Sequence, residues 1–80
     1  MNIHLIQGEF SSSDALELIT ELIHVKIKFH ENKINTLSSE EDIKSRETKI
    51  KMLQNELAAV RMKLLGIKGN VTLESQITLN

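Results

Sequence analysis

The chain has 80 residues, of which 40% are hydrophobic and 26% charged, and its formal net charge is −1 at pH 7. The absence of cysteine excludes disulfides, thiolate metal sites and thiol nucleophiles, and the scarcity of aromatic residues disfavours platforms for stacking bases. We therefore expect a single small cytoplasmic domain over residues 1–80, because so apolar and weakly charged a chain is not typical of disorder.

The first predicted element is a short strand over residues 2–7, which are rich in Ile and Leu. Gly8 follows this segment and indicates a turn. A serine-rich segment then predicts the start of a helix, with Ser11 as the N-cap that accepts a hydrogen bond from the backbone N–H of Asp14.

Two long helices are predicted next, over residues 12–36 and 39–65, because apolar residues recur in both at steps of three and four. Gly66 is expected to end the second helix in the left-handed conformation. One stripe on each helix carries these apolar positions, and we call the two stripes together the seam. The seam comprises Leu16, Ile19, Ile23, Ile27, His30, Ile34 and Leu37 on the first helix, and Ile43, Arg46, Ile50, Leu53, Leu57, Val60 and Leu64 on the second.

The two stripes of the seam match gap for gap when the second helix is folded back antiparallel to the first, which predicts a helical hairpin with coiled-coil packing. Residues 71–79 alternate between apolar or small and polar side chains, which predicts a half-buried strand. The predicted fold is therefore mainly α (α+β): an antiparallel helical hairpin flanked by short N- and C-terminal strands, in the order β-α-α-β.

One layer of the predicted seam is polar, because His30 faces Arg46. In one interpretation Arg46 extends its charge to solvent and His30 sits at the margin of the stripe. In the other interpretation the two residues form a polar layer that fixes the pairing register, and burial disfavours the charged form of His30. Both interpretations remain open from the sequence.

The first helix carries a second apolar stripe, which we call the outer stripe: Ala15, Leu18, Leu22, Val25 and Phe29. A single partner helix cannot cover both stripes, so something else must pack there. We expect a homodimer with a four-helix arrangement, in which Leu18, Leu22, Val25 and Phe29 form the interface. The alternatives are a monomer whose strands fold over the outer stripe, and a different protein partner. The sequence does not decide whether the strands pair within one chain or between two.

Motifs for chemistry are weak in this chain. Glu21 and His24 have the Glu-x-x-His spacing of carboxylate-bridged di-iron bundles, but they lie opposite both apolar stripes, so we expect no metal site. Each glycine stands at the boundary of a predicted element rather than in a phosphate-binding loop. We therefore expect neither a cofactor nor catalysis.

The predicted function is a small non-enzymatic, self-associating interaction module. The less favoured alternative is a weak nucleic-acid-associated regulator that uses Lys44, Lys49 and Lys51 at the loop end of the hairpin. An ordinary solvated helix face with spacing for ion pairs, as between Glu40 and Lys44, is the favoured explanation of this basic segment, because a protein that binds duplex DNA normally carries more positive charge. Membrane association is not expected, because no uncharged apolar stretch approaches the roughly 20 residues that a membrane helix requires.

Overall fold

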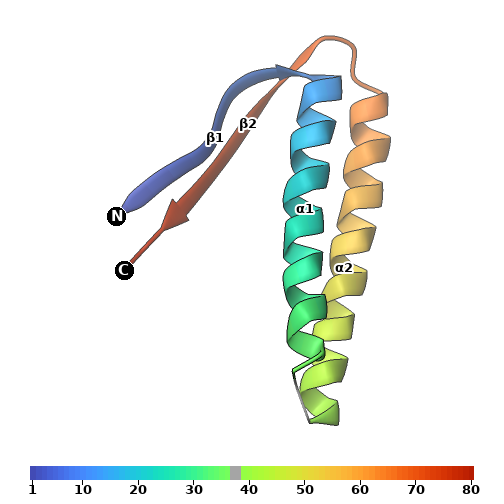
Figure 1. The fold of residues 1–80 in the computed structure, drawn as a ribbon. Coiled ribbons are helices and arrows are strands. Elements are labelled where there is room, and N and C mark those ends of the chain that lie inside the picture. The colour runs from blue at the N-terminus through green and yellow to red at the C-terminus, as the bar shows by residue number, and fades with distance from the viewer. Residues whose placement is uncertain (37–38) are drawn as a thin grey trace.

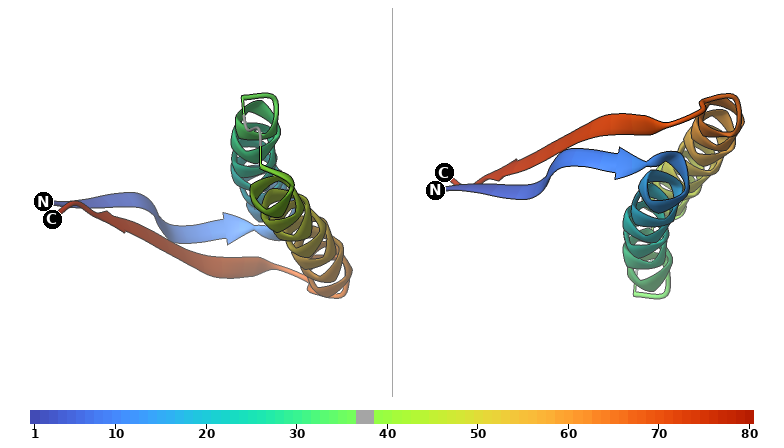
Figure 2. Two further views of the ribbon diagram at one scale, coloured as in Figure 1. Left: turned by 90° about the horizontal axis from the view of Figure 1, so that it is seen from below. Right: turned by 90° about the horizontal axis from the view of Figure 1, so that it is seen from above.

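A computed structural model describes residues 1–36 and 39–80, and in these ranges the elements follow the predicted order β-α-α-β (Figure 1). Strand β1 spans Asn2–Ser11, helix α1 spans Ser12–Ile34, helix α2 spans Glu40–Leu65 and strand β2 spans Asn70–Thr78. The helices lie side by side and antiparallel, and the strands form an antiparallel ribbon that leaves the helical pair at one end (Figures 1 and 2).

Burial along the helices follows the predicted seam. Every seam residue in the described ranges is buried or half-buried, and His30, Leu53, Leu57 and Leu64 are the most enclosed. Leu37, the last predicted seam position of the first helix, lies outside the described residues. The periodicity therefore identified correctly the surfaces that pack α1 against α2, which are the principal packed interior of the described chain.

The helix ends agree with the sequence prediction at one cap and differ at another. The Ser11 Oγ accepts from the backbone N–H of Asp14 at 3.1 Å, as predicted for the N-cap of α1. Gly66, which was expected to be left-handed, has a φ of −86° and continues the right-handed turn, and its N–H donates to the carbonyl of Lys63. The left-handed φ falls instead at Gly69, where it is 104° and the chain turns into β2.

Strand β1 is longer than predicted, since it continues through Gly8 to Ser11 instead of turning at Gly8. Gly8 pairs with Leu73 of β2, and its φ of 132° is a conformation that residues with a Cβ rarely adopt. Gly8 is therefore an interior residue of β1, at a position whose φ favours glycine. A glycine after an apolar segment indicates a turn in the local sequence, because the pairing of Gly8 with Leu73 of β2 is a contact between distant residues.

A β-bulge gives the ribbon two distinct faces. The pairing register shifts between His4 and Ile6, so that Leu5 is the extra residue of β1. This shift places Ile3 and Ile6 on the same side, although residues three apart on a regular strand point to opposite sides. We call this side the ribbon face. It comprises Ile3, Ile6, Phe10, Val71, Leu73 and Ile77, while the other side of the ribbon carries polar residues such as Glu9, Thr72, Glu74 and Gln76.

The molecule is flat and open. Its extents are 47 × 33 × 13 Å and its radius of gyration is 15.2 Å, whereas a compact domain of this length has a radius of gyration of about 12 Å. The ribbon diverges from α1 instead of folding back on it (Figures 1 and 2). In the described ranges no large side chain is fully buried. The monomeric alternative, in which the strands cover the outer stripe, is therefore not the arrangement found here.

We predict that Gly8→Ala lowers the free energy of unfolding by about 1–3 kcal/mol, because alanine at a φ of 132° is strained even though nothing lies within 4 Å of the added Cβ. Gly66→Ala is the matched control, since its φ is −86° and the added Cβ meets only the Lys63 carbonyl at 3.6 Å. The control should leave stability unchanged or raise it by up to about 1 kcal/mol. Urea unfolding followed by circular dichroism measures both variants, and equal losses would contradict the prediction.

Candidate functional site

The outer stripe is enclosed at its first residues and exposed to solvent along the rest of α1. The stripe is enclosed only at its root, the end of α1 from which the ribbon leaves (Figure 1), where Ala15 is 0% exposed and Leu18 is half-buried. Beyond the root the exposed fraction is 37% at Leu22, 66% at Val25 and 52% at Phe29. Four of the stripe's residues were predicted as interface residues, and the structure leaves the far three of them open to solvent. Large apolar side chains exposed in a row are typical of interaction surfaces.

A hollow lies at the root, where the ribbon meets α1. Phe10 of the ribbon face and Leu18 of the outer stripe line it, so the two apolar surfaces are continuous there. The remaining lining residues are acidic: Asp14, Glu17 and Glu21, all from α1 and all exposed. The hollow therefore combines an apolar floor with a negatively charged rim.

The other end of the outer stripe has the opposite character. The Phe29 ring is half in solvent, and two cations lie close to it: the Lys33 Nζ is 5.6 Å from the ring centroid and the Arg46 guanidinium carbon is 5.7 Å from it. Both distances are within the range of cation–π attraction. The stripe therefore ends in an aromatic side chain with positive charge around it.

The polar layer of the seam is a direct contact between the two helices. His30 is only 7% exposed, and its Nδ1 lies 2.8 Å from the Arg46 Nη1. Because arginine is always protonated, its N–H donates and the Nδ1 of His30 accepts, which assigns the proton of a neutral imidazole to Nε2. The structure therefore places the two residues in direct contact across the seam, with the His30 ring buried and Arg46 half-buried.

The surroundings of His30 favour the neutral imidazole. Burial lowers the pKa of His30 below its ordinary value of 6.5, and the positive charges of Arg46, Lys49 and Lys26 lower it further. Lys26, Lys49 and Glu56 share a surface depression with His30. Protonation of His30 would place an N–H donor against the Arg46 donor, so the contact between the helices requires the neutral ring.

The other sequence candidates are not brought together. Lys44 and Lys51 are seven residues apart on one side of α2, whereas Lys49 lies on the side near His30 and Lys26. Within residues 1–36 and 39–80, no three His, Asp or Glu side chains are grouped so that they could hold a metal ion. Neither helix carries, in its described residues, a stretch long and apolar enough to cross a membrane.

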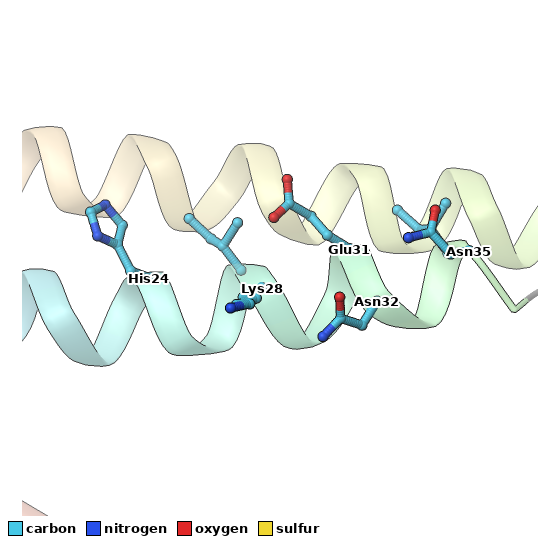
Figure 3. Close-up of a pocket in the computed structure, with 7 residues that line it drawn as sticks. His24, Lys28, Glu31, Asn32 and Asn35 are labelled. Carbon is cyan, nitrogen blue, oxygen red and sulfur yellow. The ribbon is translucent and has the colours of Figure 1, made fainter.

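A second surface depression on α1 is lined mostly by polar side chains. Figure 3 shows His24, Lys28, Glu31 and Asn32 of α1 and Asn35, the residue after its end, and these side chains stand apart from one another instead of converging on one point. His24 and Glu31 are both exposed. This surface resembles an ordinary solvated helix face more than a built binding site.

Comparison with protein-family models, with curated proteins and with solved structures gave no match for this chain.

We predict that folding stability decreases as the pH falls below 6.5, because the pKa of His30 in the folded chain lies below that value and the unfolded chain then binds more protons. The contribution is fully present above pH 6.5 and is lost as the pH falls toward the folded pKa. His30→Gln should flatten this dependence, because the amide oxygen still accepts from Arg46 but does not titrate. Denaturant unfolding across this pH range tests it, and His24→Gln is the exposed control. If H30Q and wild type show the same slope, the assignment is wrong.

A second prediction concerns the bond itself. Arg46→Leu leaves the buried Nδ1 of His30 without its donor, so it should cost about 1–3 kcal/mol of unfolding free energy. The double variant His30→Leu/Arg46→Leu should recover wild-type stability or exceed it, because apolar side chains replace both partners. Thermal and urea unfolding at one protein concentration measure this cycle. The cycle also needs His30→Leu alone. If the losses of unfolding free energy in Arg46→Leu and His30→Leu simply add up to the loss in the double variant, the two residues are not coupled.

Proposed function

We propose that this chain is a non-enzymatic interaction module that acts as a homodimer, with a second copy packed on the outer stripe. The supporting observation is the exposed area: the single chain has 6279 Å² of accessible surface. A compact monomer of this mass has about 4,900 Å². Each chain therefore exposes roughly 1,400 Å² more than a compact fold of its size would.

The excess area is of the size that a stable dimer buries. A standard interface removes about 800 Å² from each partner, and obligate homodimers remove more. The apolar content of the excess surface points the same way, since the outer stripe and the ribbon face both carry large exposed side chains, including Leu22, Phe29 and Ile3. Burial of these residues would give the domain the core that a single copy does not form.

A second copy fits better than an unrelated partner because each chain carries both halves of a self-complementary surface. The hollow with its acidic rim and Phe29 with its neighbouring cations lie at opposite ends of the same stripe. A two-fold axis brings each half against the other, and one contact is then made twice. The net charge of −1 does not oppose the association of identical chains.

The proposal of a non-enzymatic role rests on where the ionisable groups lie. The His, Glu and Lys side chains on α1 stand apart on an open helix face (Figure 3). His30, the enclosed member, is already engaged by Arg46 in the contact between the helices. These side chains contribute to helix packing and surface charge.

We predict that Leu22→Glu converts the dimer to a monomer while its helical content is retained, because the charge would be buried at the centre of the interface. The matched control is Met62→Glu, which places the same charge on α2 at a side chain that is 75% exposed. Light scattering across a concentration series gives the molar mass of both variants and of the wild type. A wild-type chain that is monomeric at every concentration would overturn the proposal, and so would an L22E variant that remains dimeric.

A further inference from the structure

The charges on α1 are divided between its two halves. Asp14, Glu17 and Glu21 lie in the first half, and Lys26, Lys28 and Lys33 lie in the second, where Glu31 is the exception. All of these side chains are exposed. Two parallel copies of α1 would place like charges together, whereas two antiparallel copies place the acidic half of each beside the basic half of the other.

The spacing of the outer stripe fits the antiparallel direction. Leu22 is its middle residue, and Ala15 and Phe29 lie seven residues before and after it. Leu18 and Val25 lie four residues before and three residues after it. A two-fold axis near Leu22 therefore places Leu22 against its own copy, Leu18 against Val25, and Phe29 beside the root of the ribbon.

The features at the two ends of the stripe are complementary in shape and charge. Phe29 is an exposed aromatic side chain with the Lys33 ammonium and the Arg46 guanidinium beside its ring. The hollow at the root has an apolar floor of Phe10 and Leu18 and an acidic rim. A large aromatic side chain that fills a pocket of the partner is typical of the residues that dominate the binding energy of an interface.

From these observations we infer that the α1 helices of two copies pair antiparallel about Leu22, and that Phe29 of each copy enters the acid-rimmed hollow between Phe10 and Leu18 of the other. This inference rests on the proposed homodimer and specifies its direction and register. The contact is formed twice in each dimer, so the basic half of each α1, which carries Lys28 and Lys33, lies beside the acidic half of the other, which carries the rim of Asp14, Glu17 and Glu21.

A charge-reversal experiment tests the contact. Glu17→Lys/Glu21→Lys makes the rim positive, and Lys28→Glu/Lys33→Glu makes the charge around Phe29 negative. Two lysines are reversed because Lys33→Glu alone would only balance the Arg46 guanidinium beside the ring. Each variant alone would place like charges together at both contacts, and we expect its dimer Kd to rise about tenfold or more. An equal mixture should form a heterodimer with near wild-type affinity, because both contacts then join opposite charges. With one of the two variants uniformly labelled with ¹⁵N, native mass spectrometry separates the homodimers from the heterodimer by mass, and circular dichroism checks that both variants fold.

The outcomes separate this inference from the proposed function. If the wild type is dimeric but the mixture shows no preference for the heterodimer, the homodimer stands and the inferred contact is wrong. If the wild type is monomeric, both fail. A parallel pairing would also favour the mixed dimer, because the positive rim of one variant would face the negative rim of the other. In a parallel wild-type dimer, however, rim already faces rim, so neither variant alone would then dimerise more weakly than the wild type. A tenfold rise in the Kd of each variant alone is therefore the result that identifies the antiparallel direction.

Cysteine cross-linking provides a second test that does not depend on charge, and the natural chain contains no cysteine to interfere. Leu22→Cys should form a disulfide-linked dimer on mild oxidation, because only a residue at the two-fold axis meets its own copy. Val25→Cys alone should remain mostly unlinked, but it should cross-link to Leu18→Cys when the two variants are mixed. Equal self-linking at both positions would indicate parallel helices and overturn the inference.

Discussion

The packing of α1 against α2 is the interaction on which the other parts of this structure depend. It encloses His30, Leu53, Leu57 and Leu64, and it holds the two ends of the chain close enough for the ribbon to form. Because the seam occupies one side of α1, the side that carries the outer stripe is left to a different partner surface. The polar layer adds a directional contact to this packing, since the His30 Nδ1 accepts only from a donor placed where Arg46 lies.

Much of the helical part of the fold could be predicted from residue spacing. The steps of three and four define the seam, and matching gaps on the two helices define their antiparallel register, which the contact between His30 and Arg46 reproduces. The strands were harder to predict, because their faces depend on pairing across the chain. Ile3 and Ile6 would lie on opposite sides of a regular strand, and only the bulge at Leu5 brings them together. Gly8 was misread as a turn for the same reason.

The candidate site was predictable as a stripe and not as a surface with distinct ends. Leu18, Leu22, Val25 and Phe29 follow from helical period alone. The hollow at the root depends on Phe10, which the sequence places only before a helix start and the structure places on the ribbon face beside Leu18. One of the two cations beside Phe29 is Arg46, which is distant in the sequence and is brought close to the ring by the packing of α2 against α1. Such features require tertiary contacts, and local patterns do not contain them.

The ribbon joins residues that are far apart along the chain, down to the Met1 ammonium, which donates to the Leu79 carbonyl across 78 positions. Closing so long a loop in a disordered chain is entropically costly, but a preformed helical hairpin shortens the effective loop to the few residues between helix and strand. The hairpin should therefore form first and the ribbon last, so the order of assembly is set by topology. A defect in the seam would then delay or prevent strand pairing at a distance, and the nascent strands would stay unpaired until the helices had docked.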